Sequence, residues 1–163
     1  QPRLTMHRPA SISDILTTDF SGDSIVITGR PATGKTWLGK KLAAITGRQV
    51  IHTDDYIRFG HVEGLYFLLD DLQTIVGPHL IEGVMGYRLL RKGVETWRYY
   101  PDVVIHLTAP AECVERTYRQ VRKEPEKLPG VKRLGMACDT ILREYLEMNN
   151  PHPPVWWDVQ NQY

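Results

Sequence analysis

The residues best suited to chemistry form one short stretch that matches the pattern G-x-x-x-x-G-K-[ST] in full. Its glycines let the backbone curl until successive N–H groups point inward and hold phosphate oxygens. The lysine reaches the β and γ phosphates of a nucleoside triphosphate, and the last hydroxyl binds magnesium. The residues expected to contact the nucleotide are Gly29, Arg30, Pro31, Ala32, Thr33, Gly34, Lys35, Thr36 and Trp37.

The neighbouring sequence agrees with this interpretation. Residues 24–28 are a β-branched run typical of a buried strand, and residues 35–45 carry apolar side chains at helical spacing. The start of such a helix adds its own partial positive charge to the loop. The alternative is a glycine-rich turn before a helix that contains Lys-Thr by chance.

Carboxylates follow two of the expected strands. Asp54 and Asp55 come directly after residues 49–52, and Glu82 ends the next apolar run. Ligands of α/β sheets bind at the carboxyl ends of the strands, so these side chains should lie beside the loop. We expect Asp54 to take the proton of an attacking hydroxyl, and Asp54 and Glu82 to bind magnesium together with Thr36. The alternative for Asp-Asp is a helix start or a turn.

Arginines recur every three residues at Arg116, Arg119 and Arg122. Side chains at this spacing share one broad face of a helix. We expect a lid at residues 116–133, in which Arg119 and Arg122 neutralise charge on the transferred group and Arg116 contacts the nucleotide. The alternative is a solvated basic face. The expected catalytic residues are Lys35, Asp54, Arg119 and Arg122.

Residues at and just beyond the two carboxylate-bearing strand ends are expected to contact the acceptor. Arg88 lies shortly after Glu82-Gly83 and is suited to an anionic acceptor. The residues expected to bind the acceptor are Asp55, Tyr56, Arg58, Glu82 and Arg88.

The periodicity of apolar residues places these groups on alternating strands and helices. Strands are expected at residues 24–28, 49–52, 79–81, 102–107 and 155–159. Helices are expected at residues 11–20, 35–45, 62–76, 86–92, 111–123 and 134–148. Strands separated by helices predict an α/β fold, a three-layer αβα sandwich with a mainly parallel five-stranded sheet.

Length and composition fit one domain. Residues 24–163 should form it, with residues 1–23 as an N-terminal leader. The chain lacks a run of about 18 apolar residues and the apolar core of a signal peptide, which predicts a cytoplasmic protein without a membrane span. A formal net charge of +1 argues against a constitutive non-specific nucleic-acid binder. Nothing in the sequence defines an oligomeric state.

The order of these motifs resembles the nucleoside and nucleotide kinase superfamily of P-loop proteins, and most of all its uridine kinase and pantothenate kinase branch. Residues 29–36, 53–56, 80–83 and 103–107 carry the resemblance, followed by the arginine-bearing helix. It implies a P-loop NTPase fold like that of nucleoside monophosphate kinases, with ATP and Mg²⁺ as cofactors. It also implies Asp54 as the catalytic base. The insertion that carries uridine recognition is not evident.

The predicted function is transfer of the γ-phosphoryl group of ATP, with magnesium, to a hydroxyl of a small molecule, nucleoside or nucleotide. Two alternatives stay open. One is a kinase acting on a hydroxyl of DNA or RNA, at a terminus or on a modified base. The other is a P-loop nucleotide-binding switch or toxin, in which binding matters more than turnover.

Overall fold

Six parallel strands form the centre of the computed structural model, which describes residues 6–162. They are β1 (His7–Ala10), β2 (Ile25–Thr28), β3 (Val50–His52), β4 (Leu80–Glu82), β5 (Val103–Thr108) and β6 (Val155–Gln160). Their order across the sheet is β1-β6-β5-β2-β4-β3, and every neighbouring pair is parallel. The predicted α/β fold with a mainly parallel sheet is confirmed. The predicted number of five strands is wrong.

The additional strand lies in the segment 1–23 that the sequence suggested as a leader. β1 pairs with β6 at the edge of the sheet, and α1 (Ile12–Thr17) follows it. Ser11 and Asp14 form a capping box at the start of α1, with bonds of 2.9 and 3.0 Å to each other's backbone. The side chains of β1 are largely exposed, so this strand is held mainly by backbone pairing. For the same reason its sequence has no apolar pattern from which a strand could be predicted. Residues 1–5 of the predicted leader lie outside the described residues.

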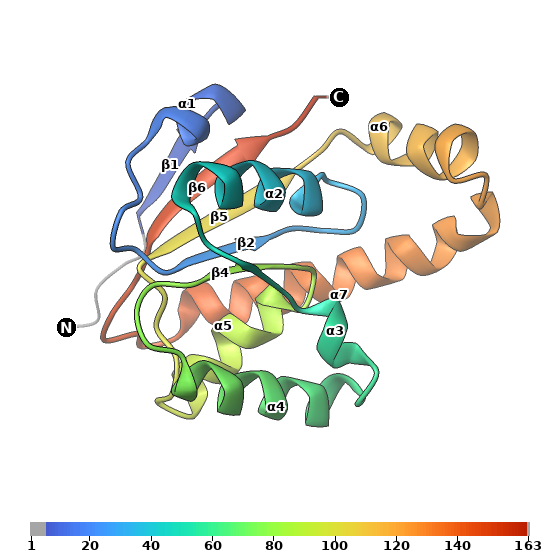
Figure 1. Cartoon of the computed structure of the whole chain (residues 1–163). Coiled ribbons are helices and arrows are strands. Elements are labelled where there is room, and N and C mark those ends of the chain that lie inside the picture. Colours follow the sequence, from blue (N-terminus) through green and yellow to red (C-terminus); the bar gives the residue numbers. More distant parts are fainter. Residues whose placement is uncertain (1–5, 163) are drawn as a thin grey trace.

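Helices cover both faces of the sheet (Figure 1). One face is covered by α1 and α2 (Lys35–Thr46). The other face is covered by α4 (His61–Thr74), α5 (Gly86–Glu95) and α7 (Leu128–Glu147). In the part of the chain that the structure describes, no helix is both long and apolar enough to cross a membrane.

Side chains along a strand point alternately to the two faces of the sheet and so contribute to the core on both faces. Ile25 and Ile27 of β2 point into the cluster beneath α1 and α2, where they meet Leu38. Val26 points the other way, into the cluster that contains Leu68 of α4 and the fully buried Trp156 of β6. Apolar residues on both faces of β2 therefore match a strand covered by helices on both sides.

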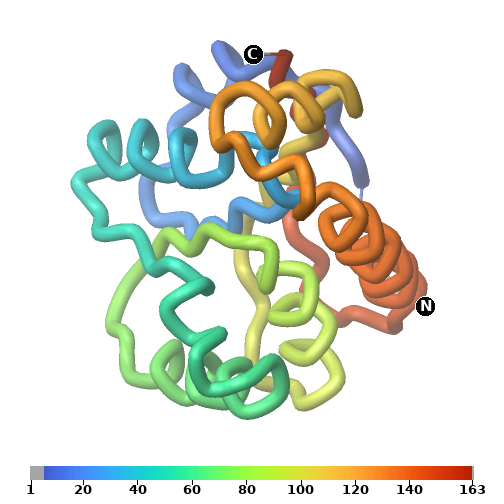
Figure 2. Tube along the Cα trace, turned by 90° about the vertical axis from the view of Figure 1, so that its right-hand side faces the viewer, coloured from blue at the N-terminus to red at the C-terminus, as the bar shows by residue number. Residues whose placement is uncertain are grey.

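The loop after β2 lies where the chain changes direction across the sheet. The chain adds β3 and β4 on one side of β2 and then β5 and β6 on the other. Such a switch point leaves a crevice outside the carboxyl ends of the strands. Figure 2 looks onto this edge, with the loop between the segment of α3 (Asp54–Ile57) and the segment that begins with α6 (Ala111–Arg116).

The region of the predicted lid differs from the prediction in two ways. The helix expected at 111–123 is α6 followed by a π-helical turn, η1 (Thr117–Val121), and the chain then bends at Lys123, whose φ is 55°. A short 3₁₀ turn, η2 (Pro125–Lys127), leads into α7, which begins before the expected residue 134. Pro129 lies in the first turn of this helix, where no N–H donor is needed.

We predict that Ile15→Ala lowers the free energy of unfolding by about 2–5 kcal/mol. Ile15 of α1 is fully buried among the residues of the α1–α2 cluster, so truncation leaves a cavity. Urea denaturation would measure the loss. Val76→Ala, at a position that is 99% exposed, should change the same quantity by less than about 0.5 kcal/mol. An equally small loss for Ile15→Ala would show that α1 does not pack onto the core.

Candidate active site

The loop between β2 and α2 adopts a conformation that its glycines permit. Gly34 has a φ of 98°, in the left-handed region that favours glycine. A Cβ at Gly29 would lie 2.2 Å from the carbonyl oxygen of Leu107 in β5. Gly34 is the N-cap of α2 and forms no side-chain cap, so the first N–H groups of this helix remain available to an anion.

Lys35 lies beneath this loop and is buried. Its Nζ donates a hydrogen bond of 2.7 Å to the carbonyl oxygen of Arg30. Burial lowers the pKa of the Lys35 ammonium to about 8, and the nearby Glu82 and Asp54 carboxylates oppose that shift. Because folding lowers this pKa from 10.5, the burial costs stability below pH 8, and the cost is relieved as the pH rises toward 10.5.

Backbone hydrogen bonds hold the ends of β2, β3 and β4 together. The Thr53 N–H donates to the Glu82 carbonyl at 2.9 Å, and the Gly83 N–H donates to the Ile27 carbonyl at 3.1 Å. A Cβ at Gly83 would lie 1.8 Å from Thr53 Oγ1, so these two strand ends approach as closely as glycine allows. Asp54, which follows Thr53, is thereby placed at the same edge as the loop.

Glu82 has a side-chain partner that the sequence did not reveal. Its Oε1 lies 2.6 Å from Nδ1 of His52, the residue opposite it in the β3–β4 register. The buried carboxylate is thus hydrogen-bonded on one side and lies near the Lys35 ammonium on the other. In the sequence, the only sign of this contact is that His52 directly precedes Thr53-Asp54 at the end of a strand. A single histidine forms no spaced motif, so the sequence could not predict its partner.

The loop, the strand ends and one lid arginine line a pocket of about 250 Å³, named the phosphate pocket below. Its lining residues are Pro31, Ala32, Gly34, Lys35, Thr36, Trp37, Asp54, Glu82, Gly83, Val84 and Arg122. The three predicted magnesium ligands, Thr36, Asp54 and Glu82, are therefore brought together. Their hydroxyl and carboxylate oxygens suit magnesium, which retains waters and needs few protein ligands. Residues 6–162 contain no cluster of three His, Cys, Asp or Glu that could hold a metal ion.

Arg122 is the lid arginine that reaches the phosphate pocket. Its guanidinium lies over the ring of Tyr118, 4.8 Å from the centroid, and Nη1 donates to the Tyr118 hydroxyl at 3.2 Å. The buried Tyr118 therefore orients this cation, which lines the same pocket as Lys35 and Asp54.

Arg116 and Arg119 do not line the phosphate pocket. Arg119 Nε donates to Glu115 at 3.1 Å on an exposed surface, and Arg116 Nη2 donates to Cys113 Sγ at 3.6 Å. The spacing of three residues would keep these arginines on one face of a regular α-helix. The π-helical turn changes the angle between successive side chains, so the expected common face is not formed.

The Arg30 side chain leaves the loop and lies against α7 instead of the phosphate pocket. It forms a two-pronged ion pair with Asp139, in which Nε donates to Oδ1 at 3.3 Å. A Cβ at Gly135 of α7 would lie 3.0 Å from Arg30 Nη1, so the arginine packs flat on this glycine. The loop is thus tied to α7, whose first residues lie within the predicted lid.

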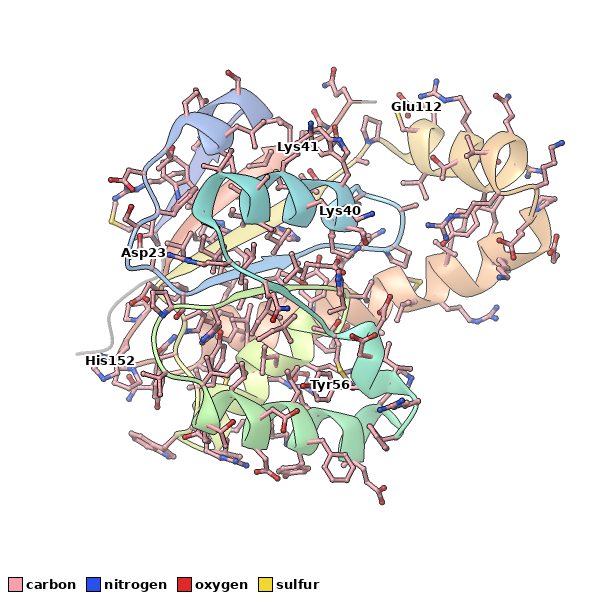
Figure 3. All side chains as sticks on the ribbon, viewed as in Figure 1. Asp23, Lys40, Lys41, Tyr56, Glu112 and His152 are labelled. Carbon is pink, nitrogen blue, oxygen red and sulfur yellow. The ribbon has the colours of Figure 1, made fainter. Side chains whose placement is uncertain are left out.

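Three of the predicted acceptor contacts lie elsewhere. Asp55, Tyr56 and Arg58 line a groove beside the edge strand β3. The Tyr56 hydroxyl donates to Asp71 at 2.5 Å, which fixes its ring between α3 and α4 (Figure 3). The Arg58 guanidinium lies over the ring of Phe59, 4.7 Å from the centroid. These residues stabilise the α3–α4 segment and do not meet the phosphate pocket.

A second pocket, of about 150 Å³, adjoins the phosphate pocket and is named the α5–α7 pocket below. Asp54 and Val84 line both pockets, and Arg88 lines the second one. The other lining residues are Ile57, His61, Met85, Tyr87, Leu134, Ala137, Cys138 and Ile141. The structure therefore brings Arg88, Asp54 and Glu82 of the prediction into two adjoining spaces.

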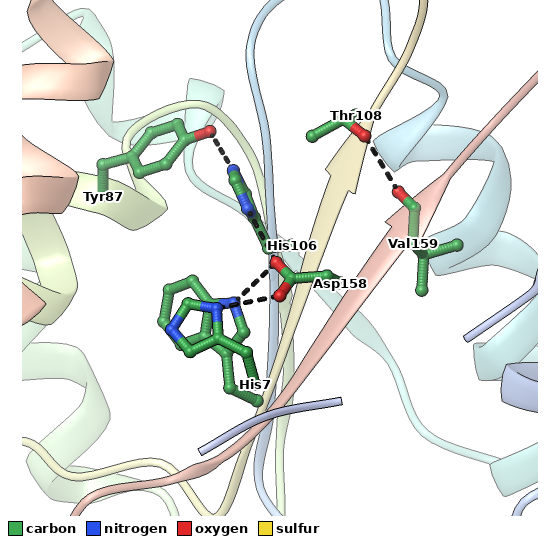
Figure 4. Close-up of polar contacts among 7 residues, drawn as sticks. His7, Tyr87, His106, Thr108, Asp158 and Val159 are labelled. Atoms are coloured by element: carbon green, nitrogen blue, oxygen red, sulfur yellow. Dashed lines mark hydrogen bonds and ion pairs between the residues drawn. The ribbon is translucent and has the colours of Figure 1, made fainter. Parts of the chain in front are cut away.

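A chain of polar groups that the sequence did not indicate crosses the sheet behind this site (Figure 4). The Tyr87 hydroxyl lies 2.8 Å from His106 Nε2, and His106 Nδ1 lies 3.4 Å from Asp158. Asp158 also bonds His7 at 2.8 Å and accepts from Trp156 at 3.0 Å. Burial lowers the pKa of His106, and its hydrogen bond to Asp158 opposes this shift. The chain fixes Tyr87 in the wall of the α5–α7 pocket.

No protein-family model and no curated protein matches this chain, but solved structures do. An uncharacterized protein from Eubacterium ventriosum aligns over 86% of this chain and 88% of its own, with a TM-score of 0.57 and 10% identity. A protein from Chloroflexus aurantiacus described as a "putative kinase" aligns over 88% and 90%, with a TM-score of 0.53 and 16% identity.

Shikimate kinase from Acinetobacter baumannii, solved with shikimate, aligns over 90% of this chain and 86% of its own, with a TM-score of 0.49 and 20% identity. At such identities the neighbours speak for the fold alone, a parallel-sheet α/β architecture that this chain shares with a protein described as a putative kinase. The closer resemblance to uridine and pantothenate kinases stays a prediction.

We predict that the dissociation constant for ATP rises with pH above about 8, the pKa of Lys35 in the free protein. Bound phosphates would stabilise the charged lysine and raise this pKa. Binding of ATP therefore takes up a proton at a pH between the pKa of Lys35 in the free protein and its higher pKa in the complex. The affinity falls by up to about tenfold per pH unit in this range, and below it the affinity does not depend on the ionisation of Lys35. Titration with a fluorescent ATP analogue would measure the profile.

Lys35→Met provides the control for this profile. The variant should bind more weakly at every pH and should lose the decline above pH 8. A decline that persists in Lys35→Met would assign the titration to another group.

Proposed function

We propose that the protein is a kinase that transfers the γ-phosphoryl group of ATP to a hydroxyl of a small molecule. The position of Asp54 carries this proposal, because its carboxylate lines both the phosphate pocket and the α5–α7 pocket. A hydroxyl bound in the second pocket would meet the terminal phosphate in the first beside a group able to take its proton. The kinase-like fold is consistent with this reaction.

In the proposed reaction the acceptor oxygen forms a bond to the γ-phosphorus. The bond from that phosphorus to the bridging oxygen breaks and releases ADP, while Asp54 accepts the hydroxyl proton. Lys35 and Arg122 neutralise charge on the transferred group, and closure around them excludes water. Arg122 takes this part in preference to Arg116 and Arg119, whose side chains are bonded on α6.

Magnesium, when bound, would neutralise the β and γ phosphates, held by Thr36 with Asp54 and Glu82. His52 would keep the Glu82 carboxylate oriented through its 2.6 Å hydrogen bond. Because the proposed donor is ATP, we place the reaction in the cytoplasm.

We predict that Asp54→Asn still binds ATP but transfers phosphate about 10²–10⁴-fold more slowly. The amide keeps the size of the side chain and cannot accept the hydroxyl proton. Binding of a fluorescent ATP analogue and formation of ADP in the presence of acceptor would measure the two effects separately.

Asp55→Asn is the matched control for this variant. Asp55 is the next residue along the chain but lines the groove beside β3, so its variant should keep most of the activity. Loss of transfer in Asp55→Asn with retention in Asp54→Asn would reverse the assignment of the base.

A further inference from the structure

We propose that the phosphoryl acceptor is a small hydroxy acid, whose carboxylate is bound by Arg88 and whose hydroxyl is placed at Asp54. This inference rests on the proposed kinase function and names the substrate class of the same site. It follows from the charge, the size and the lining of the α5–α7 pocket.

The charge in the pocket points to an anionic ligand. Arg88 of α5 is only partly exposed, and no described residue forms a hydrogen bond or ion pair with it. A guanidinium removed from water without a partner is costly, and its planar fork matches the two oxygens of a carboxylate. By contrast Arg91, one turn along the same helix, is paired with Glu144 of α7 at 2.7 Å. Arg88 is therefore free to bind a ligand.

A single negative charge suits the pocket better than two. The Asp54 carboxylate lines the same space, and Arg88 is its one lining arginine or lysine. A phosphate monoester carries close to two negative charges at neutral pH, and one guanidinium would balance only half of them. A carboxylate monoanion is matched by Arg88 alone, which favours a hydroxy acid over a nucleotide acceptor.

The size and the lining of the pocket favour a short carbon skeleton. Pockets for drug-sized ligands occupy about 300–1,000 Å³, and the α5–α7 pocket is about 150 Å³. Its walls between the two polar groups are apolar, with Ile57, Met85 and Ile141 among them. A space of this size favours a short acid over a nucleoside or a strand of DNA or RNA.

The positions of Asp54 and Arg88 define the orientation of the acceptor in the pocket. Asp54 lies at the junction with the phosphate pocket, while Arg88 lines only the α5–α7 pocket. The carboxylate and the reacting hydroxyl should therefore lie at opposite ends of the acceptor, separated by its apolar carbons.

The test follows label from γ-labelled ATP, with magnesium, into three sets of acceptors. The first set contains straight-chain, branched and alicyclic hydroxy acids of three to seven carbons. The second contains the corresponding diols, in which the carboxylate is replaced by a neutral hydroxymethyl group. The third contains nucleosides, nucleoside monophosphates and short DNA and RNA oligomers. We expect label on one or more hydroxy acids and a preference of about 10- to 100-fold over the matched diol, the value of a charge-assisted hydrogen bond.

Arg88→Met and Arg88→Lys test the carboxylate contact. Arg88→Met should raise KM for the hydroxy acid about 10- to 100-fold and leave KM for the diol and the affinity for ATP unaltered. Arg88→Lys keeps the charge but loses the planar, two-pronged guanidinium. Its KM for the hydroxy acid should lie between those of the unmodified protein and Arg88→Met. If Arg88→Met raised KM equally for the acid and the diol, the proposed carboxylate contact would be overturned, because the variant would then act only through the structure of the pocket.

Ala137→Phe tests the location of the acceptor without removing a charge. Ala137 of α7 lines the pocket, so the larger side chain should fill it and block transfer while ATP still binds. Met136→Phe is the matched control, because Met136 is the preceding residue and is 69% exposed. Full transfer to the acid in Ala137→Phe would overturn the proposed location.

The outcomes separate the acceptor class from the kinase function. Label on a nucleoside or an oligomer, with none on any acid, would overturn the hydroxy-acid proposal and keep the kinase. Label on no acceptor, although ATP is bound, would overturn both proposals.

Discussion

The Lys35 ammonium is held almost out of water, and the surrounding residues must compensate for the hydration that it loses. One proton is satisfied by the Arg30 carbonyl, and the Glu82 and Asp54 carboxylates supply opposite charge. This arrangement is possible only if the loop and the ends of β3 and β4 approach closely. The lowered pKa indicates that compensation is incomplete until an anion enters, and the phosphate pocket is the space beside it.

The sheet order makes this approach possible. β2 lies between β4 and β5, so the loop that follows it opens at the switch point of the sheet. Gly83 lets the end of β4 touch Thr53, and Gly29 lets the loop touch β5. Gly29 permits a contact with the backbone of β5 and Gly83 permits one with the Thr53 side chain, and a Cβ at either position would prevent that contact. Chemical groups from three strand ends therefore reach one pocket without a long connecting loop.

Helix α7 contacts both the loop after β2 and the α5–α7 pocket. Arg30 of the loop is paired with Asp139 on one of its faces, while Leu134 and Ile141 on another face line the α5–α7 pocket. A shift of α7 would thus change the loop and the acceptor pocket together. In many enzymes such coupling lets a lid close over both parts of a site when substrate binds.

The sequence by itself determined the phosphate-binding loop, the alternation of strands and helices, and Asp54 and Glu82 at strand ends, because these depend on local spacing and on apolar periodicity. The tertiary structure decided what depends on partners distant in the chain. β1 is held by pairing with β6, and His52 meets Glu82 through strand register. The π-helical turn removed Arg116 and Arg119 from the pocket, and only the packing of α5 against α7 showed that Arg88 and Asp54 share one space.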